Sequence, residues 1–204
     1  MTPSSVQDDL AFMKSLTDGD VARRQQAQFG KIYFAAGVIY GFQVVVQWAA
    51  YAKLIVMPID DGLFILAINF TFLSYLGWAM WNNRGLGQGT MTNRAINAAF
   101  AAIGAANLAV TLILFIGAWR LNNQMIGVLI PCVIFALQGA AWFVAYTLRR
   151  RAWLGVVAAV WMVTSIAMAF YVGSVVFMLL IGLGILLWMA VPGFVMMRLA
   201  SKAA

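Results

Sequence analysis

The stretch Thr147-Leu148-Arg149-Arg150-Arg151-Ala152-Trp153 decides the fold, because it holds the only run of three like charges in the chain. About twenty mostly apolar residues lie on each side of it. At a helical rise of 1.5 Å per residue, that length crosses a hydrocarbon core of about 30 Å. The triplet therefore predicts a tight turn between two membrane helices. Because Lys and Arg are retained on the cytoplasmic face, it also predicts which face the turn occupies.

The overall composition indicates a membrane protein. Hydrophobic residues make up 64% of the 204 residues and charged residues only 9%, whereas soluble domains carry about 25% charged residues. The net charge of +7 could indicate nucleic acid, but the basic residues lie at the ends of apolar runs. Membrane topology explains that placement, so we expect the lipid bilayer as a partner and no nucleic acid.

Hydropathy predicts an all-α polytopic membrane protein with six transmembrane helices, arranged as three consecutive hairpins. Residues 1–31 form a cytoplasmic N-terminal segment, residues 32–198 the transmembrane domain, and residues 199–204 a cytoplasmic tail. The predicted spans are residues 32–52, 63–81, 95–119, 125–148, 152–172 and 175–197. Each is long enough to cross a bilayer.

The distribution of Lys and Arg predicts the orientation. On one side lie Lys14, Arg23, Arg24, Lys31, Arg84, Arg94, Arg149, Arg150, Arg151, Arg198 and Lys202, eleven of the thirteen basic residues. Only Lys53 and Arg120 lie on the other. By the positive-inside rule both termini are cytoplasmic. We expect a multi-pass protein of a bacterial-type inner membrane.

The N-terminal segment predicts a short amphipathic helix over residues 5–17, ending near Thr17–Asp20. Val6, Leu10, Met13 and Leu16 recur at helical spacing. The helix either packs against the protein's own cytoplasmic face or docks a protein partner through Leu10, Met13 and Leu16.

Small residues and proline predict details of the bundle. Gly37 and Gly41 form a small-xxx-small pattern that allows close approach of a neighbouring helix. Pro131 removes a backbone donor and predicts a kink in the fourth span. In the third span, alanine recurs every four residues on each of two helix faces. We therefore expect this span to be a central helix with several neighbours. These alanines are Ala98, Ala101, Ala102, Ala105, Ala106 and Ala109.

The chain has few of the residue types that catalysis requires. The chain has no His and one Cys, Cys132, so the commonest metal ligand and neutral-pH acid/base is missing. No ionisable residue lies well inside a predicted span, and such residues normally mark proton or ion pathways. We therefore expect no metal, no cofactor and no enzymatic activity.

Neutral polar side chains share one depth in the membrane. At 1.5 Å per residue, Gln43, Asn69, Asn107 and Thr164 lie about 20 Å from the cytoplasmic ends of their spans, and Gln138 lies nearer that end. They either bond helices to one another or line a ligand pocket. Three tryptophans away from the interfaces would add aromatic walls to such a pocket: Trp142, Trp161 and Trp188.

These observations predict a non-catalytic membrane protein that acts by binding, as an accessory or regulatory subunit or as a small-ligand-binding protein. The alternative is a small transporter or channel-like protein for a neutral or lipophilic solute, with the midplane polar residues as its site. A protein partner and a homo-oligomer both remain open.

Overall fold

The computed structural model describes the backbone of residues 3–82 and 91–202 and the side chains of residues 21–82 and 91–201. This part of the chain is helical and contains no strand. The helices are α1 (Pro3–Tyr51), α2 (Asp61–Asn82), α3 (Met91–Arg120), α4 (Gln124–Val128), α5 (Ile130–Arg149), α6 (Ala152–Phe170) and α7 (Val175–Lys202). Within the described residues, six segments are long and apolar enough to cross a membrane, with α4 and α5 together forming one of them. The prediction of six long apolar helices is confirmed, and the chain has the build of a multi-pass membrane protein. Residues 83–90, a glycine-rich stretch between α2 and α3 in the sequence, lie outside the described residues.

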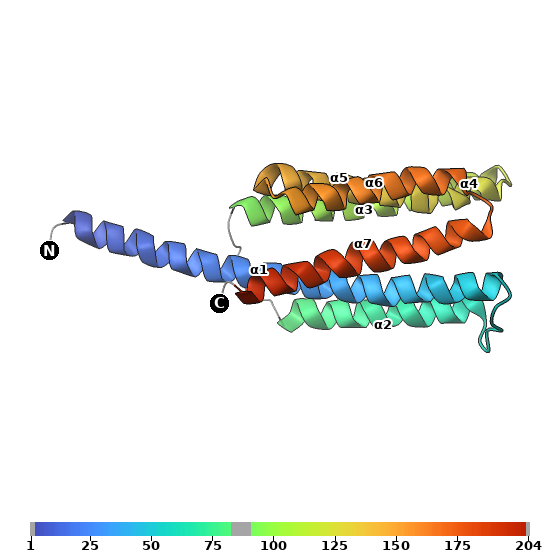
Figure 1. Cartoon of the computed structure of the whole chain (residues 1–204), viewed down its shortest axis with the longest axis horizontal. Helices are drawn as coiled ribbons and strands as arrows, with labels where there is room; N and C mark the ends of the chain where they lie inside the picture. The colour runs from blue at the N-terminus through green and yellow to red at the C-terminus, as the bar shows by residue number, and fades with distance from the viewer. Residues whose placement is uncertain (1–2, 83–90, 203–204) are drawn as a thin grey trace.

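Helix α1 differs from the expected short helix followed by a separate span. It runs unbroken from Pro3 to Tyr51, so the predicted end near Thr17–Asp20 is wrong. A single glycine inside a helix costs only about 1 kcal/mol, and Gly19 is exposed, so the helix continues through it. The N-terminal turns extend beyond the bundle (Figure 1). The side chains of Leu10, Met13 and Leu16 lie outside the described part.

The helices form two layers, with α1, α2 and α7 in one layer and α3, α4, α5 and α6 in the other (Figure 1). Both termini lie at the same end of the bundle. The most extensive contacts join α1 to α7 and α5 to α6. The first and last spans are therefore neighbours, and pairing in three consecutive hairpins is not the main packing pattern.

Glycines bring α1 and α7 together. A Cβ atom on Gly37 would lie 2.5 Å from the Ala190 nitrogen, and one on Gly41 would lie 2.8 Å from the Leu186 backbone. From the other side, a Cβ on Gly193 would lie 2.6 Å from the Phe34 nitrogen. The predicted close approach at Gly37 and Gly41 is thus present, with α7 as the neighbour.

The fourth span is interrupted where Pro131 was expected to kink it. Helix α4 ends at Val128, Leu129 caps it, and α5 begins at Ile130 with proline in its first turn. Proline is tolerated there because the first turn of a helix needs no amide donor.

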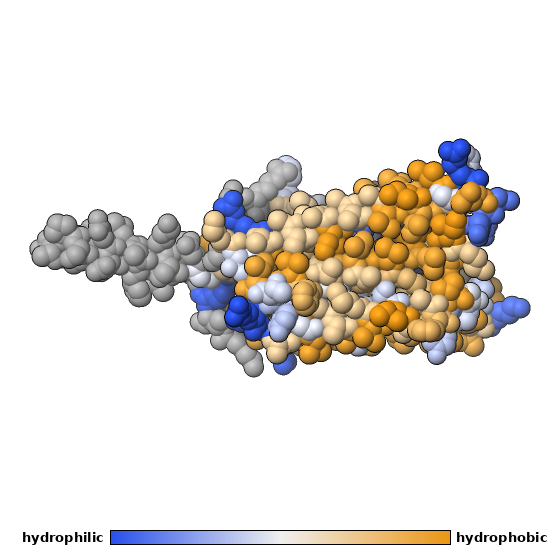
Figure 2. Space-filling model, turned by 90° about the horizontal axis from the view of Figure 1, so that it is seen from above, coloured by the Kyte–Doolittle hydropathy of each residue, from blue (hydrophilic) through white to orange (hydrophobic). Residues whose placement is uncertain are grey.

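Helix α3 is not the central helix that its alanines suggested. It contacts mainly α4 and α5, and five of the six alanines are exposed: Ala98, Ala101, Ala102, Ala105 and Ala109. Small residues permit close packing but do not require it, and here these faces turn outward. The visible surface carries a broad apolar zone with hydrophilic residues gathered at its two ends, as a bilayer-spanning bundle needs (Figure 2).

The core lies mainly among α5, α6 and α7, and α1 and α3 contribute Tyr33 and Ile96 to it. Its largest fully buried side chains are Trp142, Trp161, Phe135, Leu154 and Met168. The Phe135 and Trp161 rings meet edge to face with centroids 4.6 Å apart. This filled core connects the two layers and fixes the position of the C-terminal end of α5.

Candidate functional site

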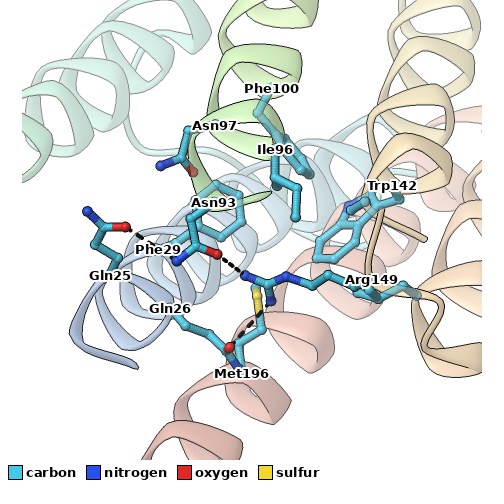
Figure 3. Close-up of a pocket in the computed structure, with 12 residues that line it drawn as sticks. Gln25, Gln26, Phe29, Asn93, Ile96, Asn97, Phe100, Trp142, Arg149 and Met196 are labelled. Carbon is cyan, nitrogen blue, oxygen red and sulfur yellow. Dashed lines mark hydrogen bonds between the residues drawn. The ribbon is translucent and has the colours of Figure 1, made fainter. Parts of the chain in front are cut away.

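The three arginines of the α5–α6 turn have different surroundings. Arg150 adopts a left-handed conformation (φ 50°), and its amide donates to the Tyr146 carbonyl, which ends α5. Arg151 is extended and precedes α6, and both Arg150 and Arg151 are exposed. Arg149, the last residue of α5, is only partly exposed. Its side chain turns back into the bundle (Figure 3).

Amides from two other helices hold the Arg149 guanidinium. Its Nη2 donates to Asn93 Oδ1 on α3 at 2.6 Å, and its Nη1 donates to Gln26 Oε1 on α1 at 3.3 Å. Asn93 in turn donates from Nδ2 to Gln25 Oε1 at 3.4 Å. Figure 3 shows these bonds closing one side of a pocket.

This pocket, termed here the Arg149 pocket, lies where α1, α3 and α5 meet. Its polar side is formed by Arg149, Asn93, Asn97 and the two glutamines, and its apolar side mainly by Phe29, Ile96, Phe100 and Trp142. The cavity measures about 40 Å³. That is a few times the space one water molecule needs and far below the 300 to 1,000 Å³ typical of drug-sized sites.

No acidic side chain is among the described residues that line the Arg149 pocket. Arg149 therefore brings a positive charge to a half-buried position, and the described acceptors around it are all neutral. A guanidinium carries five donors in a planar fork, and the two amide oxygens accept from only two of its nitrogens. This arrangement suits a small group that brings its own negative charge.

Aromatic rings form the inner wall of the pocket. Trp142 Nε1 donates to the Tyr33 hydroxyl at 2.8 Å, and both side chains are buried. Phe100 meets Trp142 edge to face with centroids 5.4 Å apart and meets Phe29 at 5.0 Å. These ring contacts hold the pocket wall in place and restrict the conformations of the side chains packed behind it.

Two of the expected midplane groups, Asn69 and Thr164, form hydrogen bonds between pairs of helices. Asn69 accepts from the Tyr40 hydroxyl at 3.1 Å, joining α2 to α1. Thr164 accepts from Trp188 Nε1 at 3.0 Å, joining α6 to α7. Ser165, next to Thr164, donates to the Cys132 carbonyl at 2.7 Å. These groups lie at separate helix contacts and do not converge on one pocket.

The remaining candidates fall into two groups. Gln138 and Trp161 lie close to the Tyr33 hydroxyl beside Trp142, although Trp161 Nε1 has no hydrogen-bond partner. Gln43 Oε1 and Asn107 Oδ1 are also buried without a partner. Of all the predicted ligand-binding residues, Trp142 alone lines the Arg149 pocket.

The polar residues of the pocket were missed by sequence reasoning. Gln25 and Gln26 fell within the N-terminal segment that was expected to lie outside the membrane domain, and Asn93 and Asn97 lay at the edge of a predicted span. A signal was present, because Asn93 and Asn97 are four residues apart and so share one helix face. The inward turn of Arg149 had no sequence signal.

Comparison with protein families, characterised proteins and solved structures found no match to this chain.

Proposed function

We propose that this protein is a non-catalytic membrane protein that binds a small organic anion in the Arg149 pocket. The observation that carries the proposal is the half-buried guanidinium of Arg149, held by neutral amides at the mouth of an aromatic-walled cavity. A short carboxylate of about three to five heavy atoms matches the cavity size. Its carboxylate would face Arg149 and its alkyl end would face Phe100 and Trp142.

Neutral and cationic molecules fit this site less well. A cation would be repelled by the guanidinium, and a neutral molecule would leave the half-buried charge without a counterion. A hydrogen bond to a charged group contributes about 1.5–3 kcal/mol, so charge should dominate selectivity. We expect binding without turnover, because the described lining of the pocket holds no carboxylate, thiol or imidazole to act as a base or nucleophile.

We also propose that the Arg149 pocket opens toward the cytoplasm of a bacterial-type inner membrane. The described basic residues of α1, α3, the α5–α6 turn and α7 gather at the end of the bundle that carries the termini: Arg23, Arg24, Lys31, Arg94, Arg149, Arg150, Arg151 and Arg198. The positive-inside rule predicts that this end faces the cytoplasm. The ligand would then be a cytoplasmic metabolite. The protein would act as an accessory or regulatory subunit that responds to it.

Saturation-transfer NMR on the full-length protein in detergent tests the proposal. The probes are propionate and its neutral isostere propionamide. We expect saturation transfer to propionate and at least a tenfold weaker response for propionamide, as loss of one charge-assisted bond predicts. Equal responses from the two probes would contradict the proposal.

Transport of a neutral solute through the bundle remains a second candidate, and one observation favours it. Gln43 Oε1 and Asn107 Oδ1 are buried in membrane spans without hydrogen-bond partners, and an unpaired amide in lipid is costly. The hydroxyl groups of a passing solute would donate to each of these oxygens in turn. Uptake of glycerol into proteoliposomes that is lost in Gln43→Leu and Asn107→Leu would support transport, and equal uptake by the wild type and empty liposomes would exclude it for this solute.

A further inference from the structure

A second concave site lies on the outside of the bundle, between the cytoplasmic-end segments of α1 and α7. Arg23, Arg24, Ala27 and Lys31 line it from α1, while Met197, Ala200 and Ser201 line it from α7. Its volume is about 490 Å³, far larger than the Arg149 pocket. We call it the α1–α7 groove. It shares no lining residue with the Arg149 pocket.

We propose that the α1–α7 groove binds the phosphate headgroup of an anionic phospholipid from the surrounding leaflet. Arg24 and Lys31, at positions i and i+7 of α1, both line the groove, and no acidic residue is among the described residues of the lining. Arg24 and Lys31 are exposed. Basic pockets at the membrane-facing ends of helices are recognised sites for anionic headgroups.

The α7 side of the groove contributes shape and an apolar floor. The Ser201 hydroxyl donates to the Arg198 carbonyl at 2.9 Å, so headgroup recognition falls on Arg24 and Lys31 of α1. Met197 and Ala200 provide the apolar floor. The tight glycine contact between α1 and α7 holds the two walls at a fixed separation.

Acyl chains would have an apolar surface next to the groove. Phe34 lies three residues beyond Lys31 toward the membrane and is 37% exposed, and Phe194 on α7 is 45% exposed. The Arg198 guanidinium lies over the Phe194 ring at 5.0 Å from its centroid. Along these helices, basic residues at the end of the bundle are followed by exposed aromatic side chains. A lipid has the same order, with a charged headgroup followed by apolar chains. This continuity favours a membrane lipid over a soluble phosphate.

The test uses full-length protein in detergent and native mass spectrometry. The probes are short-chain phosphatidylglycerol, the matching phosphatidylcholine and inorganic phosphate. The variant is Arg24→Gln with Lys31→Gln. Its matched control is Arg94→Gln with Arg151→Gln, which removes the same charge from exposed positions outside the groove. A charge-preserving variant, Arg24→Lys with Lys31→Arg, should retain binding if the folded groove is intact.

We expect the wild type to bind phosphatidylglycerol in preference to phosphatidylcholine. The groove variant should bind it about 30-fold more weakly, since each basic residue near an anionic headgroup contributes about a fivefold factor. The control should bind it as the wild type does. Three results would overturn the proposal: equal binding of the two lipids, equal losses in the groove variant and the control, or displacement of phosphatidylglycerol by an equal concentration of inorganic phosphate.

Discussion

Arg149 Nη2 and Asn93 Oδ1 lie 2.6 Å apart, although 56 residues separate them in the chain. The bond ties the last residue of α5 to the first turn of α3, and the Arg149–Gln26 bond extends the connection to α1. Arg149 therefore links three helices, although its place at the turn between two membrane spans predicts a side chain in water. The contact also defines the polar side of the Arg149 pocket.

Replacing Arg149 with Lys tests the planar shape of the guanidinium separately from its positive charge. An ammonium keeps the positive charge but lacks the planar fork that reaches Asn93 and Gln26 together. We expect the free energy of unfolding to fall by about 1.5–3 kcal/mol, the contribution of one hydrogen bond to a charged group. Thermal unfolding in detergent would measure it, with Arg150→Lys, an exposed neighbour, as the control. Equal stability of the two variants would show that the fork geometry is irrelevant.

Replacing Gly193 with Ala should loosen the contact between α1 and α7. The added methyl group would lie 2.6 Å from the Phe34 nitrogen and 2.8 Å from the Gly30 carbonyl oxygen, both backbone atoms. Overpacking of this kind costs about 1–3 kcal/mol. Gly104→Ala is the matched control, because a Cβ there has no neighbour within 4 Å. Chemical unfolding that gave equal changes for both variants would contradict the described packing.

Replacing Tyr33 with Phe should leave the Trp142 indole N–H buried without a partner. Tyr33 and Trp142 are 6% and 1% exposed, so water should not replace the lost acceptor. We expect a loss of about 1–3 kcal/mol in stability. A double-mutant cycle with Trp142→Phe isolates the pairwise term. Additive effects of the two substitutions would show that the bond contributes nothing.

Cysteine labelling tests the proposed orientation. Cys132 is buried and is first replaced by Ala. Single cysteines are then placed at Ile59, which is 53% exposed between α1 and α2, and at Arg151 in the α5–α6 turn. In intact spheroplasts we expect an impermeant maleimide to label the first position and not the second. The reverse pattern would place both termini outside the cell.

The sequence was sufficient for the helices and insufficient for their arrangement. Span length, hydropathy and the Arg149–Arg151 turn depend on local physical chemistry, so all six apolar helices could be predicted. Gly37 and Gly41 predicted a close neighbour, but a glycine pattern does not say which helix supplies it. That neighbour is α7, from the other end of the chain.

The site was harder to predict for the same reason. The midplane polar residues share a depth, but rotation about each helix axis decides whether they meet, and Asn69 and Thr164 bond to different neighbours. Arg149 was assigned to the aqueous turn on charge alone. Only the positions of Asn93 and Gln26 reveal that it turns inward.

Propionate titration of Arg149→Gln and Arg151→Gln, followed by saturation-transfer NMR, tests the central claim most directly. The two variants lose the same charge from the same turn, but only Arg149 lines the pocket. We predict that propionate binds about 10- to 100-fold more weakly to Arg149→Gln, as loss of a charge-assisted hydrogen bond requires. Binding to Arg151→Gln should match the wild type. Equal affinity of both variants for propionate would contradict the claim that the Arg149 pocket is the binding site.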